Sequence, residues 1–133
     1  MQPLGIHTTM DGSFDDARAK VAAALQREGF GVLTEIDVQA TLKKKLDVDF
    51  RRYTILGACN PPFAHRALQT HLDVGLLLPC NVIVYEEDGG RVHVAAIDPL
   101  ETIAARGEPE LRAIASEVRA KLDRAIAGLG NPT

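Results

Sequence analysis

The turn Asp88-Gly89-Gly90 constrains the fold more than any other segment of this sequence. Asp and Gly at a tight turn tolerate the positive φ angles that a β-hairpin needs. Two apolar segments flank the turn, residues 75–86 and 91–97, and apolar residues alternate in the second of them. The pattern predicts two antiparallel strands that are neighbours in a sheet.

Period-two and helical spacing of the apolar residues predicts the other elements. Strands are expected at residues 4–9, 32–37 and 52–59, and helices at 14–29, 38–46 and 61–73 and from residue 109 onward. The last helix has the longest apolar stripe, formed by Leu111, Ile114, Ala115, Val118, Leu122, Ala125, Ile126 and Leu129. In the strand 32–37, we expect Val32, Thr34 and Ile36 on one face. Pro79 cannot donate to a ladder, so a bulge or an unpaired stretch is expected there, inside the strand 75–86.

This order of elements predicts an α+β protein with a single, mostly antiparallel five-stranded sheet backed by one layer of helices. Such a sheet has two edges and one uncovered face. Because exposed edges and faces tend to pair with other chains, we expect a homodimer.

Composition narrows the class of protein. With 133 residues, 46% of them hydrophobic and 25% charged, the chain is expected to form one globular domain over residues 1–133. A net charge of -3 gives no general attraction to phosphate backbones or anionic lipids, so neither nucleic acid nor a membrane is expected as a partner. The first residues lack a basic segment followed by an apolar run, so we expect a cytoplasmic protein with reduced cysteines.

Two Cys-Asn pairs, Cys59-Asn60 and Cys80-Asn81, are the candidate site residues. Each pair stands beside a proline at a predicted strand break, and a helix is expected to begin just after Asn60. A helix N-terminus stabilises a thiolate, which would make Cys59 reactive. Two alternatives stay open: the cysteines are buried packing residues, and the asparagines tie the strand breaks to nearby backbone.

If the two strands are neighbours, the two sulfur atoms would share a site, either as a redox pair or as ligands of a soft metal ion. Zinc sites usually need four ligands, and His65 and His71 are the histidines closest in sequence. Six residues along a helix place their imidazoles about 120° apart, which argues against joint ligation. We therefore assign no metal ligands.

The other polar features have ordinary explanations. His7 and His93 are expected on strands without a nearby Ser, Cys or Asp in sequence, so no catalytic role is assigned to them. The acidic run at residues 86–88 is typical of a solvated turn, and the basic residues 43–45 are typical of a solvated helix face. No glycine-rich phosphate loop opens a helix, so nucleotide binding has no support.

Three segments resemble a known family: Gly29-Phe-Gly31, Gly57-Ala-Cys59-Asn-Pro61 and Gly75-Leu-Leu-Leu-Pro-Cys80-Asn-Val-Ile-Val-Tyr85-Glu. They are similar to the domain of unknown function 302 family. The resemblance implies a β-α-β(4)-α outline like the TATA-binding-protein fold, without implying DNA binding. It also implies small bacterial or archaeal cytoplasmic proteins that pair as dimers, some of them associated with sulfur or redox metabolism.

The resemblance names no activity and no cofactor. Our leading hypothesis is a binding or sensing module for a small molecule or anion, a soft metal ion or a sulfur species, built around Cys59, Asn60, Cys80 and Asn81. One alternative is a thiol enzyme with Cys59 as nucleophile. The other is a dimeric interaction domain in which both cysteines only pack.

Overall fold

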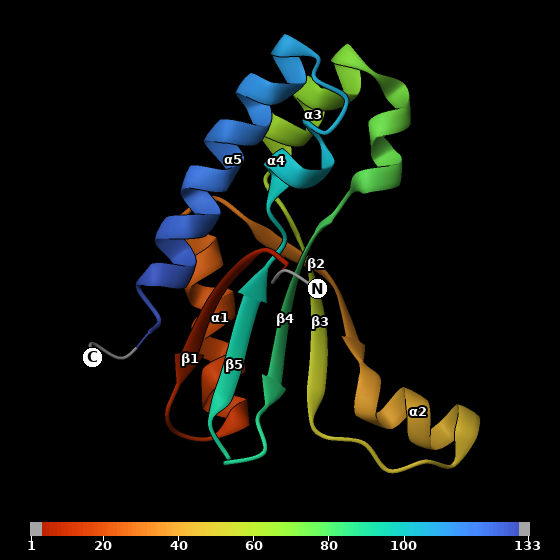
Figure 1. Ribbon diagram of the computed structural model, residues 1–133, viewed down its shortest axis with the longest axis vertical. Helices are drawn as coiled ribbons and strands as arrows, with labels where there is room; N and C mark the ends of the chain where they lie inside the picture. The colour runs from red at the N-terminus through yellow and green to blue at the C-terminus, as the bar shows by residue number, and fades with distance from the viewer. Residues whose placement is uncertain (1–3, 131–133) are drawn as a thin grey trace.

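A single antiparallel sheet runs through the middle of the protein (Figure 1). The structure, a computed structural model, describes residues 4–130. The strands are β1 (Ile6–Met10), β2 (Gly31–Asp37), β3 (Tyr53–Cys59), β4 (Cys80–Glu86) and β5 (Val92–Ala96). They lie in the order β1-β5-β4-β3-β2, and every neighbouring pair is antiparallel. The predicted α+β class and five-stranded sheet are confirmed.

Two long helices cover one face of this sheet. Helix α1 (Phe14–Arg27) begins at Ser13, whose hydroxyl accepts a hydrogen bond from the Asp16 N–H at 3.1 Å. Helix α5 (Pro109–Ala127) buries the predicted apolar stripe from Leu111 to Ile126. The fully buried strand residues on the covered face include Val82, Val84, Val92 and Val94. Each such side chain stabilises the fold by about 1.5–3 kcal/mol.

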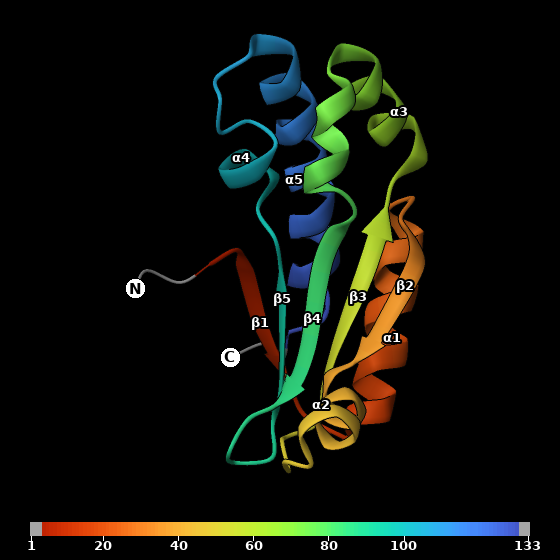
Figure 2. The same ribbon diagram turned by 90° about the vertical axis from the view of Figure 1, so that its right-hand side faces the viewer.

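The remaining helices gather at the two ends of the sheet (Figure 2). Helix α3 (Pro61–Thr70), the 3₁₀ helix η1 (Leu72–Leu77) and helix α4 (Pro99–Thr102) lie at the end where β3 stops and β4 begins. Helix α2 (Val38–Leu46) lies at the opposite end. None of the helices within residues 4–130 combines the length and apolar character needed to cross a bilayer.

The prediction for residues 75–79 is wrong. The strand was expected to start at Gly75, with a bulge or an unpaired stretch at Pro79, but β4 starts at Cys80 and η1 occupies residues 72–77. The Leu78–Pro79 peptide bond is cis, and Pro79 stands just before the strand. A short apolar run does not distinguish a strand from a helical turn by its periodicity, which is why this segment was misassigned.

The bulge lies in β2 instead. Val32 pairs with Ala58 and Thr34 pairs with Gly57, so the register shifts by one residue between them. Because paired residues share a face, Val32 and Thr34 point to opposite faces of the sheet, contrary to the predicted alternation. Only Thr34 and Ile36 lie together on the face that α1 and α5 leave open.

Gly57 leaves room for two neighbours of β3. A Cβ atom at this position would lie 2.1 Å from Thr34 Oγ1 and 2.8 Å from Pro79 Cγ. We predict that Gly57→Ala lowers the free energy of unfolding by about 1–3 kcal/mol, because overpacking forces one of these neighbours to move. Urea denaturation measures the change.

Gly31→Ala is the matched control, since a Cβ on Gly31 in β2 meets nothing within 4 Å. Alanine there should leave the free energy of unfolding unchanged or raise it by up to about 1 kcal/mol. Equal stability of the two variants would contradict the close packing of Thr34 and Pro79 against β3.

Candidate functional site

The pairing of β3 with β4 brings the two cysteines together. Cys59 is the last residue of β3 and Cys80 is the first residue of β4. Ala58 is the register partner of Cys80, so Cys59 follows directly after the residue that faces Cys80, and the alternation of β3 sends the Cys59 side chain towards the other face of the sheet. Residues 21 positions apart in sequence thus become neighbours at one end of the sheet.

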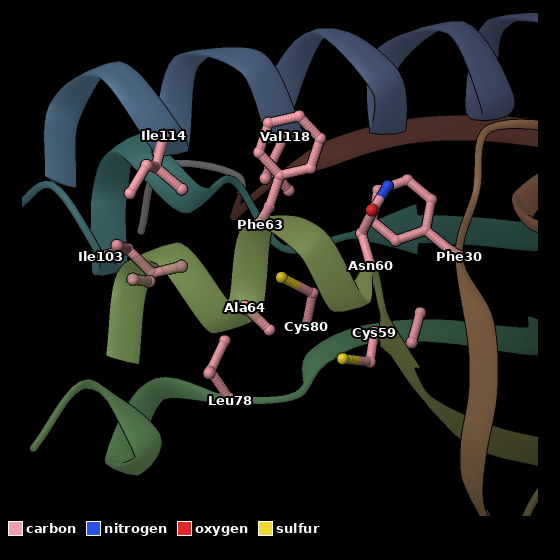
Figure 3. A pocket seen from close by; sticks show the side chains of 12 residues that line it. Phe30, Cys59, Asn60, Phe63, Ala64, Leu78, Cys80, Ile103, Ile114 and Val118 are labelled. Atoms are coloured by element: carbon pink, nitrogen blue, oxygen red, sulfur yellow. The ribbon is translucent and has the colours of Figure 1, made fainter. Parts of the chain in front are cut away.

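Both cysteines line the same small cavity (Figure 3). It offers about 20 Å³ of space for the centre of a water-sized molecule, which is enough for roughly one such molecule. The Cys80 sulfur lies among the labelled side chains, and the Cys59 sulfur lies towards their edge. Apart from the cysteines and Asn60, the wall is apolar and comes mainly from α3, α5 and the loops beside β4: Phe30, Ala58, Phe63, Ala64, Ala67, Leu78, Ile103, Ile114 and Val118.

Asn60 has the structural role that the sequence left open. It is buried at the N-terminus of α3, and its side-chain Nδ2 donates to the Glu28 carbonyl at 3.1 Å. This bond ties the junction of β3 and α3 to the C-terminal end of α1. Asn60 therefore fixes the position of Cys59 next to it.

Asn81 lies apart from the cavity. Its register partner is Gly57, so its side chain points to the open face of the sheet, where it is exposed. The alternation of a strand sends neighbouring side chains to opposite faces, and the Cys80 side chain takes the covered face. The structure thus brings together Cys59, Asn60 and Cys80 but not Asn81.

Burial keeps both thiols protonated at neutral pH. It raises the pKa of the Cys59 thiol above its ordinary value. Burial, together with the nearby Cys59, raises the pKa of Cys80 to about 11. The start of α3 after Cys59 therefore does not produce the low pKa that a reactive cysteine needs.

The described part of the chain contains no metal site with three or more protein ligands. Within residues 4–130, no group of three or more His, Cys, Asp or Glu side chains is placed to hold a metal ion. His71 is engaged at the start of η1, where its Nδ1 accepts a hydrogen bond from the Asp73 N–H at 3.2 Å.

Sequence reasoning missed one cluster of polar residues. His7 on β1 and His93 on β5 lie on the open face, and His7 Nδ1 is 2.8 Å from His93 Nε2. They are 86 positions apart in sequence, and only the pairing of β1 with β5 brings them together. The alternation of both strands signals a shared face, but it does not reveal which strands are neighbours.

The fold and the cavity define a small α+β protein with a thiol-lined cavity at one end of its sheet. The family model described as "Domain of unknown function DUF302" matches residues 6–129, so the chain belongs to the DUF302 family. A crystal structure described as an uncharacterized conserved DUF302 protein from Bacillus stearothermophilus is similar, with a TM-score of 0.85 and 29% sequence identity. The similarity covers 92% of this chain and 95% of that chain. No curated protein matches the sequence.

The difference in burial predicts different rates of alkylation at the two cysteines. A pKa of about 11 instead of the ordinary 9.0 leaves about 100-fold less thiolate on Cys80 at pH 7. We predict that iodoacetamide modifies Cys59 slowly and Cys80 hardly at all in the native protein. Both rates should rise with pH, because ionisation of the raised-pKa thiols then produces the reacting thiolate. Peptide mass spectrometry measures them.

The protein unfolded in urea is the control, since both thiols are then exposed and should react at similar rates. Native Cys80 reacting as fast as Cys59 would contradict the burial described here.

Proposed function

We propose that this protein binds and senses a soft, thiophilic ligand about one atom in size, held between Cys59 and Cys80. The observation that carries the proposal is that two thiols from neighbouring strands line one small apolar cavity. Two kinds of ligand have this chemistry. One is a monovalent soft metal ion such as Cu(I) or Ag(I), and the other is the sulfane sulfur of a persulfide.

The chemistry of the cavity wall supports a soft ligand over a hard one. The wall contains no charged side chain, so an inorganic anion would lose its hydration without gaining a cationic partner. Divalent zinc prefers four ligands, and the cavity offers two thiols. Thiolates select Cu(I) among biological metal ions, and a soft ion or a sulfur atom is polarisable enough for an apolar site.

Binding of a monovalent ion is coupled to protons. Each thiol has to lose its proton to become a ligand, so one bound ion releases two protons to solvent. Because burial raises the pKa of both thiols, the affinity should fall steeply as the pH falls through the neutral range. The half-buried Cys59 provides the entrance, and the buried Cys80 holds the ligand.

The raised pKa of Cys59 weighs against the alternative of a thiol enzyme. A nucleophilic cysteine works as its thiolate and is normally activated by a neighbouring base or cation. The cavity wall supplies neither. A reducing compartment such as the cytoplasm would keep both thiols available for a ligand, which fits a cytoplasmic protein.

Titration with silver tests whether the ligand is a soft metal ion and avoids redox side reactions. We predict that the wild-type protein binds one Ag(I) per chain, measured by isothermal titration calorimetry in a chloride-free buffer. Cys59→Ser and Cys80→Ser should each weaken binding by at least about 100-fold, because one ligand cannot replace two. Titration in two buffers of different ionisation enthalpy should give the release of two protons per ion. Asn81→Ser, next to Cys80 but outside the cavity, should bind like wild type.

Reaction with glutathione persulfide tests whether the ligand is a sulfane sulfur. The Cys59 thiolate would attack the outer sulfur, the S–S bond of the donor would break, and glutathione would leave as the thiol form after taking up a proton. The protein then carries a persulfide and gains the mass of one sulfur atom. Silver binding without sulfur transfer assigns the site to a metal, and the reverse result assigns it to sulfur. The proposal is wrong if the wild-type protein shows neither silver binding nor sulfur transfer. It is also wrong if both are unchanged in the double variant Cys59→Ser, Cys80→Ser.

We also propose that a second copy of this chain covers the open face of the sheet. All seven residues of β2 are exposed, and every residue of α2 is at least partly exposed. Ile36 on the open face is 48% exposed. Charge supports a second copy as the partner, because the basic residues 43–45 of α2 and the acidic residues 86–88 lie at the same end of the sheet. A two-fold axis would place the basic helix of one chain over the acidic turn of the other.

Light scattering after gel filtration tests this assembly. We predict a mass of twice 14.4 kDa for the wild type and of one chain for Ile83→Lys, because a lysine in the middle of the open face would be buried unpaired. Gln26→Lys on the exposed side of α1 is the control and should remain a dimer. A wild-type monomer at micromolar concentration would contradict the proposal.

A further inference from the structure

Four aromatic rings form a row across the open face of the sheet. Tyr53 on β3 stacks on Tyr85 on β4, with ring centroids 5.3 Å apart and an angle of 7° between the planes. Tyr85 stacks on His93 on β5 at 4.8 Å and 22°. His93 meets His7 on β1 edge to face at 5.1 Å and 60°. The first three rings are cross-strand partners in the register, and His7 reaches His93 diagonally.

The hydrogen bonds of this row determine which ring nitrogens carry protons. His7 Nε2 is hydrogen-bonded to the Leu4 carbonyl, which only accepts, so Nε2 carries the proton. In a neutral His7, Nδ1 is then the acceptor, and it accepts from His93 Nε2 at 2.8 Å. A neutral His93 that donates from Nε2 has an unprotonated Nδ1.

That nitrogen, His93 Nδ1, is buried and has no hydrogen-bond partner within residues 4–130. The nearest charged group is the Glu87 carboxylate in the β4–β5 turn, with Oε2 3.5 Å from Nδ1 but not aligned for a hydrogen bond. Two acceptors thus face each other, which is unfavourable in a partly buried place. A proton on Nδ1 would turn this repulsion into a charge-assisted hydrogen bond.

We propose that His93 Nδ1 is a proton-binding site, and that the proton it takes up completes a chain from Glu87 through His93 and His7 to the Leu4 carbonyl. The chain joins the β4–β5 turn to β5, to β1 and to the residues before β1. β1 is an edge strand that pairs only with β5, and the one added bond, between Glu87 and His93, fixes the ring to which His7 of β1 is hydrogen-bonded. The protein would respond to acidification by gaining this bond.

The other groups around His93 leave Glu87 as its charge partner. On β4 the ring of Tyr85 covers one face of the imidazole, and Tyr53 lies beyond it. On β1 the only titratable neighbour is His7. In the turn, Arg91 pairs with Asp11 at 3.2 Å, and Asp88 pairs with Arg51 at 3.0 Å.

Long-range ¹H–¹⁵N NMR of the histidine rings tests the proposal directly. As the pH is lowered, His93 Nδ1 should change from the chemical shift of an unprotonated nitrogen to that of a protonated one. His93 Nε2 should keep its proton throughout. Amide exchange in β1 should slow as the pH falls, by more than the intrinsic chemistry of exchange accounts for, because the completed chain holds the strand.

Glu87→Gln keeps the shape of the side chain and removes its charge. In this variant, His93 should take up its proton at lower pH, and the additional protection of β1 should disappear. Glu86→Gln is the matched control, because Glu86 pairs with Val92 rather than with His93, and it should titrate like wild type. A neutral His93 protonated at Nδ1 and bare at Nε2 would overturn the proposal, as would a Glu87→Gln variant that titrates like wild type.

Discussion

The antiparallel register between β3 and β4 is the constraint on which the candidate site depends. It places the end of β3 beside the start of β4, and a cysteine stands at each of these two strand ends. Gly57 lets the Pro79 ring pass close over β3, and Asn60 anchors the start of α3 to the end of α1. A shift of this register by one residue would send Cys80 to the open face and away from the apolar side chains of α3 and α5.

The environment of the thiols then determines their chemistry. A cysteine in an exposed polar site gains reactivity from nearby cations or helix ends, but this cavity is enclosed by apolar side chains of α3 and α5. Burial raises the pKa of both thiols, so they remain protonated at neutral pH. The same packing that stabilises this end of the sheet therefore favours binding of a soft ligand over nucleophilic catalysis.

Much of the fold could be predicted from the sequence, because local patterns reflect local structure. The stripe of α5, the N-cap at Ser13 and the hairpin after β4 each follow from neighbouring residues. The stretch from Gly75 to Leu77 was wrongly predicted as a strand because it is apolar without a period, and the bulge after Val32 left no local signal.

The candidate site was predictable only in part, since it depends on contacts between distant residues. The repeated Cys-Asn pairs pointed to the right strand ends, but their spacing contained no information on which face each side chain takes. Asn81 therefore belonged to the prediction and not to the cavity. His7 and His93 were given no role for the same reason, because the order of the strands brings them together.

X-ray diffraction from silver-soaked crystals, with the anomalous signal of silver, shows whether Cys59 and Cys80 share a ligand. One strong peak is expected inside the cavity, within bonding distance of both the Cys59 and the Cys80 sulfur atoms. Silver bound elsewhere on the chain, or bound to one cysteine with the other turned away, would contradict a shared site.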